Sequence, residues 1–259
     1  MGGFRSKKDT VNEFSCDWMP RLARRVGVWL VWLMLAAGGQ AAQPAPGLLL
    51  QNAVGSIVQG AQPAADLPEL QCGNLVYAGN KSSVCFAENF LSDLVRGTHL
   101  NVAKKFLSLR LDSDALFDSP FCVFSGEESF TLTQKERDSL RKYLFNGGFI
   151  LSSPGCSDEK WDKSVRKEIK LAFPEYELVK IPMTHPVFSV VNQLSKLVDK
   201  SGKAVLLEGL EINGRLAMIY SKEGLNDVAH AKGCCCCGGN EIRDPARVNV
   251  NIFTYALLY

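Results

Sequence analysis

The sequence lacks an excess of charge of either sign. It has 29 basic and 27 acidic residues, a formal net charge of +2, and the two signs are mixed along the chain. Nucleic-acid-binding proteins usually concentrate basic residues on one face or in one segment. The charge pattern therefore predicts no role in nucleic-acid binding.

The glycine signatures of phosphate and dinucleotide sites are also missing. Those sites place a glycine-rich turn between a strand and a helix, so that backbone N–H groups reach the phosphates. The glycines in "GCCCCGG" have no such context. No nucleotide or other organic cofactor is predicted.

The longest apolar run, "VGVWLVWLMLAA" at residues 26–37, is shorter than the roughly 20 residues of a membrane-spanning helix. Arginines precede it, and the small residues of "GGQAAQPAPG" follow it. We predict a signal peptide over residues 1–42, with a possible true start at Met19, and export to the periplasm or cell envelope. In the alternative interpretation the segment stays uncleaved and associates the protein with the membrane.

The next segment, residues 43–69, is rich in Pro, Ala, Gln and Gly and predicts a flexible linker. One folded domain is predicted over residues 70–259, and it contains no internal repeat.

Apolar strands and amphipathic helices alternate through this domain. In "TLTQKERDSLRKYLFNGGFILSS", Thr133 and Glu136 form a capping box, and two glycines end the helix before the next strand. Alternation at this pitch predicts a mainly parallel sheet with helices on both faces. Near the C-terminus, Asn213 and Gly214 predict a β-hairpin. A last helix is predicted to begin with Asp244 as N-cap and Pro245 at the first helical position.

Several stretches carry a resemblance to a known family. The stretches "LRKYLFNGGF", "THPVF" and "VNIFTYAL" are its specific parts, and the similarity covers about residues 70–259. The domain resembles the bacterial domain of unknown function 4159, which is placed among proteins with a class I glutamine-amidotransferase-like fold. The resemblance implies a three-layer α/β/α architecture of the flavodoxin-like kind and an envelope setting, and it implies no established reaction.

Amidotransferase chemistry needs a cysteine on a tight strand-to-helix turn, activated by a histidine. In "SSPGCSDEKWD", Cys156 follows a predicted strand and precedes a helix, but the Gly-x-Cys-x-Gly pattern of a nucleophile turn is absent. His185 follows the next strand and could approach the same sheet edge. A catalytic Cys156–His185 pair is one interpretation. In the other, Cys156 forms a disulfide and His185 caps a loop before Pro186.

Carboxylates are predicted at the same crevice. Glu127 and Glu128 follow a buried strand, at the sheet edge where ligands usually bind. Asp158 begins the helix after Cys156, where an acidic residue also favours the helix dipole. These three residues are candidates for ligand contact, with solvated loop charges as the alternative.

Once Cys16 is removed with the signal peptide, eight cysteines remain, and an even number in an oxidising compartment suggests disulfides. Adjacent cysteines bridge poorly because their Cα atoms lie too close. The disulfide candidates are Cys72, Cys85, Cys156, Cys234, Cys235, Cys236 and Cys237. The alternative is a Zn²⁺ or Cu(I) site built from the four-cysteine run, with His230 or His185 as an added ligand.

The sequence thus favours an exported, non-catalytic α/β module that binds a small molecule or an envelope protein. Two alternatives remain open: a hydrolase or amidotransferase-like enzyme, and a metal-binding or redox protein.

Overall fold

The computed structural model describes residues 69–83, 86, 88–225 and 242–259. Within them, seven strands form one sheet in the order β2-β1-β3-β4-β7-β6-β5. The strands are β1 (Cys72–Val76), β2 (Leu107–Arg110), β3 (Phe121–Gly126), β4 (Phe149–Pro154), β5 (Leu178–Lys180), β6 (Glu208–Ile212) and β7 (Arg215–Tyr220). The predicted signal peptide, nearly all of the linker, Cys85 and the four-cysteine run lie outside the described residues.

Most of the sheet is parallel. β1 pairs in parallel with β2 and β3, β3 with β4, and β4 with β7, whereas β6 is antiparallel to both of its neighbours. The chain passes from β1 to β2 on one side and then to β3 on the other. The connections therefore change direction between β1 and β3, and the crevice at such a point is where open α/β sheets bind ligands.

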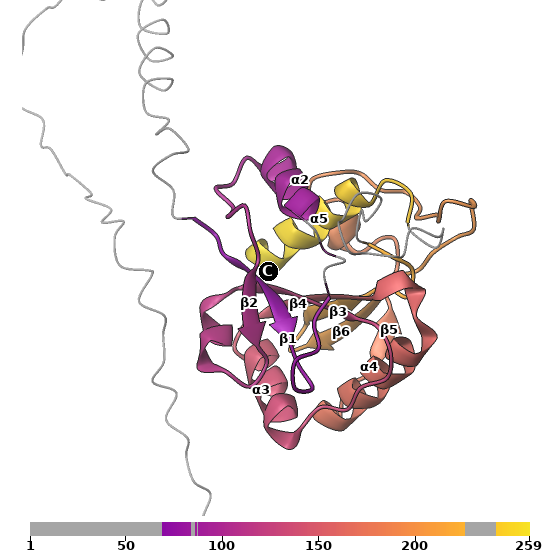
Figure 1. The fold of residues 1–259 in the computed structure, drawn as a ribbon. Helices are drawn as coiled ribbons and strands as arrows, with labels where there is room; N and C mark the ends of the chain where they lie inside the picture. Colours follow the sequence, from indigo (N-terminus) through magenta and orange to yellow (C-terminus); the bar gives the residue numbers. More distant parts are fainter. Residues whose placement is uncertain (1–68, 84–85, 87, 226–241) are drawn as a thin grey trace, which may run out of the picture. The chain divides into compact units, whose positions relative to one another are not determined.

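Helices cover both faces of the sheet (Figure 1). Helices α2 (Glu88–Thr98) and α5 (Pro245–Leu258) pack on one face, and α3 (Gln134–Phe145) and α4 (Glu159–Ala172) on the other. Successive strand residues point to opposite faces, so Phe121 joins one hydrophobic core and Phe124 joins the other. The predicted three-layer α/β fold is confirmed.

Local sequence signals placed several elements correctly. The capping box at the start of α3 is present, with both the Thr133 and the Glu136 bonds. Asn213 and Gly214 have positive φ angles of 54° and 79° in the turn that joins β6 to β7, as a two-residue hairpin requires.

The start of α5 differs from the prediction. The helix does begin at Pro245, but the Asp244 side chain makes no capping hydrogen bond and its backbone is left-handed. Its carboxylate instead lies 3.6 Å from Arg247. The carboxylate therefore pairs with a side chain on the first turn rather than with the backbone N–H groups.

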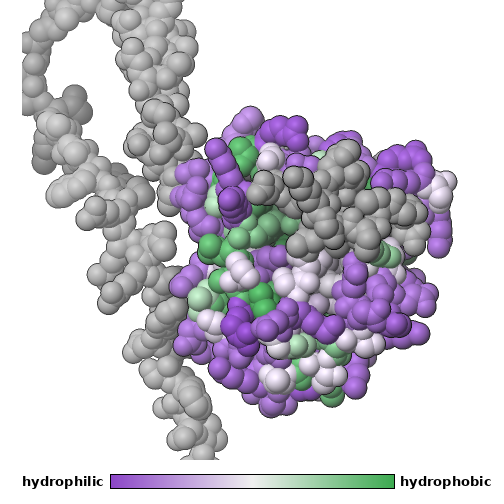
Figure 2. Space-filling model, viewed as in Figure 1, coloured by the Kyte–Doolittle hydropathy of each residue, from purple (hydrophilic) through white to green (hydrophobic). Residues whose placement is uncertain are grey.

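The surface of the described domain is mostly hydrophilic on the side that Figure 2 shows. The exposed large apolar side chains are distributed over different elements, among them Leu107 on β2, Leu171 on α4 and Val179 on β5. Their spread favours a search for function among polar groups at the sheet edge.

Candidate functional site

The carboxyl ends of the parallel strands collect unusual backbone conformations. Ala78 follows β1 with φ 46°, Glu128 follows β3 with φ 62°, and Cys156 and Ser157 follow β4 with φ 54° and 52°. A left-handed backbone at a non-glycine residue costs about 1–3 kcal/mol and persists only where surrounding contacts enforce it. Such residues cluster at binding and catalytic sites, so this edge is the candidate site.

The turn after β4 is joined to the loop after β3 by side chains. Cys156 Sγ lies 3.3 Å from Glu127 Oε1, and Lys160 Nζ lies 2.8 Å from Glu128 Oε2. Asp158 caps α4 by accepting a hydrogen bond from the Trp161 N–H at 2.7 Å. The structure therefore brings Cys156, Glu127 and Glu128 together, with Asp158 at the adjacent helix start.

A buried hydrogen bond links the residues that lie under this edge of the sheet. Trp161 Nε1 donates to the Tyr77 hydroxyl at 2.7 Å, and that hydroxyl donates to the Ser125 carbonyl at 3.1 Å. A Cβ at Gly126 would lie 1.9 Å from the Tyr77 hydroxyl. Only glycine therefore fits at the end of β3.

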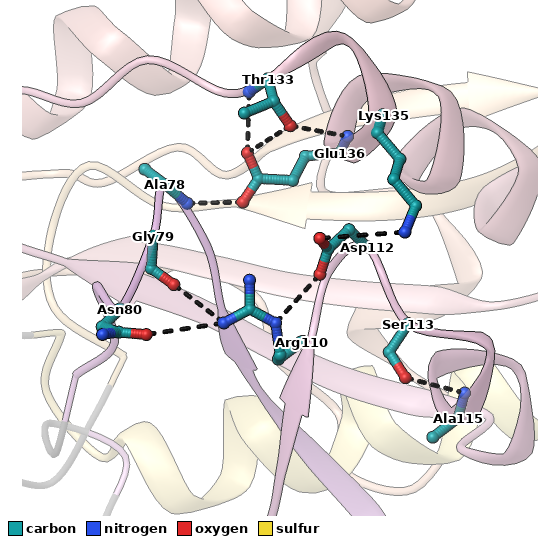
Figure 3. Close-up of polar contacts among 10 residues, drawn as sticks. All are labelled: Ala78, Gly79, Asn80, Arg110, Asp112, Ser113, Ala115, Thr133, Lys135 and Glu136. Atoms are coloured by element: carbon teal, nitrogen blue, oxygen red, sulfur yellow. Dashed lines mark hydrogen bonds and ion pairs between the residues drawn. The ribbon is translucent and has the colours of Figure 1, made fainter.

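The loop after β1 is fixed by Glu136 and Arg110 (Figure 3). Glu136 is almost fully buried, and its carboxylate accepts hydrogen bonds from Ala78 N at 2.6 Å and Thr133 N at 2.7 Å. Arg110 donates to the Gly79 carbonyl at 3.1 Å and to Asp112 at 3.1 Å. The capping box was visible in the sequence, but the bond of Glu136 to Ala78, in a turn 58 residues away, had no sequence signal.

A cavity of about 280 Å³ lies on the other side of the Cys156 turn. Its walls come from the segments that follow β4 and β7 and from the turn at residues 199–203. It is lined by Ser157, Glu159, Asp199, Lys203, Lys222 and Glu223. None of these residues was predicted as a site residue, because separate charged loop residues carry no motif.

His185 lies at the opposite end of the sheet. Its ring is 5.3 Å from the ring of Tyr255, which packs 6.5 Å from Phe149 at the start of β4. Cys156 comes after the end of that strand, whose six residues span roughly 16 Å. The structure therefore does not bring Cys156 and His185 together.

The contacts of His185 account for its position. Its Nδ1 accepts a hydrogen bond from the Val187 N–H at 3.2 Å and caps a short helix that begins at Pro186. Partial burial lowers the pKa of His185, and the nearby Glu211 opposes that shift. The capping role was the second of the two interpretations of the sequence.

The sequence carries the signature of one family across most of this domain. The family model described as "Domain of unknown function (DUF4159)" matches residues 74–257. The chain belongs to this family. A search of the curated proteins finds no match. The range that matches DUF4159 contains Glu127, Cys156 and His185, and the four-cysteine run as well.

In this DUF4159 domain, two of the cysteines are buried thiols. Cys72 on β1 is 1% exposed and Cys122 on β3 is 0% exposed, and they belong to different hydrophobic cores. Burial raises the pKa of Cys72 to about 12 and that of Cys122 to about 11. Cys72 is a free thiol, so the structure gives no support to its predicted disulfide.

The other cysteine predictions, and the membrane, can be addressed only in part. His230 and the cysteines at 85 and 234–237 lie outside the described residues, so the predicted zinc or copper site falls there. In the described part of the DUF4159 chain, no three metal-ligating side chains come together. No helix in that part is long and apolar enough to cross a membrane.

Replacing Glu136 tests the support of the loop after β1. We expect Glu136→Gln to lower the free energy of unfolding by about 1–3 kcal/mol, because an amide N–H₂ would then face a buried backbone N–H. Hydrogen exchange at the Ala78 amide should also become faster. Urea unfolding and amide exchange measure both effects.

Asp138→Asn is the matched control, since Asp138 lies on the same helix with its side chain bonded only to exposed Gln134. It should change the stability by less than about 0.5 kcal/mol. An equally small effect of Glu136→Gln would contradict the role assigned to Glu136.

Thiol alkylation tests the two buried cysteines. We expect Cys72 and Cys122 to stay unmodified by iodoacetamide in the native protein near neutral pH, because both are buried and little thiolate forms. Both should react in denaturant without reductant, as read by peptide mass spectrometry. Reaction of either in the native protein, or a need for reductant at Cys72, would refute this assignment.

Proposed function

We propose that this chain is a non-catalytic module that binds a small polar ligand at the carboxyl edge of its parallel strands. One observation carries the proposal: four left-handed non-glycine residues follow three adjacent strands at this edge. Their strain is maintained by Glu136, by Trp161 and Tyr77, and by the Cys156–Glu127 contact. Fixed polar groups around a crevice favour ligand binding because little freedom is lost when the ligand enters.

The contact between Cys156 and Glu127 favours binding over catalysis. An imidazole has an ordinary pKa of about 6.5, near that of a thiol at about 8.5, and so removes the thiol proton readily. Among the groups in contact with Cys156 is the carboxylate of Glu127, and a carboxylate is a much weaker base than an imidazole. A carboxylate accepts the thiol hydrogen bond but is a poor base for it. The parallel sheet and the strand-to-helix turn still support a distant relation to the glutamine-amidotransferase-like proteins.

A thermal-shift experiment tests ligand binding. The panel contains inorganic phosphate, acetate, ethylammonium, glycine and glycylglycine. We expect at least one compound to raise the melting temperature by several degrees, since a ligand at 100 times its Kd stabilises by about 2.7 kcal/mol. Ser157→Phe, which fills the cavity, should abolish the shift.

Ser195→Phe is the control, because Ser195 is exposed and lies outside the cavity. It should retain the shift. If no compound stabilises the protein at millimolar concentration, a small polar ligand at this edge is ruled out as proposed.

We further propose that the module acts outside the cytoplasm. The support is the arrangement of arginines, a short apolar run and small residues at the N-terminus. When the full-length chain is expressed, the protein recovered from the periplasm should begin at Ala42 or Gln43, as read by N-terminal sequencing. Leu33→Arg should prevent export. Recovery of the whole chain with an intact N-terminus, in the membrane fraction, would instead support an anchor.

A further inference from the structure

The cavity beside the Cys156 turn has fixed walls. Ser153 and Ser221 both donate to the carbonyl of Glu223, at 3.4 and 2.6 Å, and hold the segment after β7 against β4. The Asp199 carboxylate accepts hydrogen bonds from Ser201 Oγ at 2.6 Å and Lys203 N at 2.9 Å. Asp199 is therefore used in shaping its own turn, and the other charged side chains remain for a ligand.

Four charged side chains of the cavity form no ion pair within the part of the chain that the structure describes. Among the residues that the structure describes, neither the lysines Lys203 and Lys222 nor the carboxylates Glu159 and Glu223 form an ion pair with another side chain. By contrast, Lys160 and Lys170, in the same region of the chain, are both paired with carboxylates. The cavity thus offers a ligand two ammonium groups and two carboxylates without ion-pair partners, and the Asp199 carboxylate adds a third negative charge.

These charges restrict the class of ligand. A metal cation would be repelled by the two ammonium groups, and a polyanion would be repelled by the three carboxylates, Asp199 included. An apolar molecule would remove four charges from water and supply no partner for them. A small molecule with one acidic and one basic group could pair its carboxylate with the lysines and its ammonium group with the glutamates.

The size of the cavity points to a small ligand. Its volume of about 280 Å³ is at the lower limit of ordinary ligand sites, which begin near 300 Å³. It lies at the carboxyl ends of two parallel strands, β4 and β7, where α/β sheets bind ligands. Position and size agree with the charge argument.

We propose that this cavity binds a small zwitterion, with its carboxylate at Lys203 and Lys222 and its ammonium group at Glu159 and Glu223. The proposal rests on the proposed ligand-binding function and names the class of ligand. An amino acid or a short peptide end has the required pair of charges. The cavity determines which separation of the ligand's two charges fits best, and the experiment measures that separation.

Nuclear magnetic resonance titration of the full chain tests this inference. The probes are glycine, β-alanine and 4-aminobutyrate, which differ in the separation of their charges, and the one-charge analogues propionate and propylamine. We expect one zwitterion to shift the amide signals of Ser157, Glu159 and Lys222 and to bind at least about tenfold more tightly than either analogue, since each charged partner adds a charge-assisted hydrogen bond.

Charge variants assign the partners. Lys222→Met and Glu223→Gln should each weaken binding of that zwitterion by about tenfold. Lys163→Met is the control, because Lys163 is an exposed lysine on α4 outside the cavity, and it should leave the affinity unchanged. Both cavity variants replace exposed or partly exposed side chains, so folding is checked by the unshifted remainder of the spectrum.

The other outcomes separate the two proposals. If propionate or propylamine binds as tightly as the best zwitterion, the cavity is a site for a single charge. This inference then fails and the binding function stands. This inference also fails, and the binding function stands, if a zwitterion binds but neither Lys222→Met nor Glu223→Gln weakens its binding. If no probe binds here and none stabilises the protein in the thermal-shift panel, both proposals fail.

Discussion

The hydrogen bond from Trp161 Nε1 to the Tyr77 hydroxyl is the contact on which the candidate site depends. It joins the end of β1 to the first turn of α4, and it passes beneath Gly126 at the end of β3, where any Cβ would collide with it. Both rings are buried and pack edge-on against Phe124. Because the hydrogen bond is shielded from water, it fixes the ends of these elements relative to one another.

The two ends of the sheet differ in how they use polar groups. At the amino end, polar side chains complete the fold: Arg215 donates to the carbonyls of Gly147 and Gly148, and the Tyr255 hydroxyl accepts from the Leu216 N–H. At the carboxyl end, the cavity carries charges that form no ion pair among residues 69–83, 86, 88–225 and 242–259, beside strained turns. The strained backbone at this end is the feature on which the binding proposal is based.

Prediction from sequence succeeded where the signal is local. The capping box at Thr133 and the turn at Asn213 each depend on residues a few positions apart, and both are present. It left two interpretations of His185 open, a partner of Cys156 or a cap of the loop before Pro186, and the structure shows the cap. After β5 the chain turns back across the face of the sheet, so that His185 packs on Tyr255. The order of elements along the chain could not predict this path of the segment after β5.

The cavity was missed for a different reason. Lys203, Lys222 and Glu159 come from three segments, and each has the ordinary appearance of a solvated loop or helix charge. These residues became candidates because they line one cavity and form no ion pair among the described residues. A sequence does not show which ion pairs form. Only the packing of the segments around β4 and β7 shows that these charges share one space.

Cys156 occupies a position at which other α/β proteins place a nucleophile. It has the placement of a nucleophile, between a parallel strand and a helix, with a left-handed backbone. The Gly-x-Cys-x-Gly pattern of a nucleophile turn is absent, and the thiol contacts the carboxylate of Glu127. A strained turn still holds side chains at fixed positions at the edge of the sheet, and that advantage does not require a base. The same geometry that would present a nucleophile to a substrate therefore presents Ser157 to the cavity beside it.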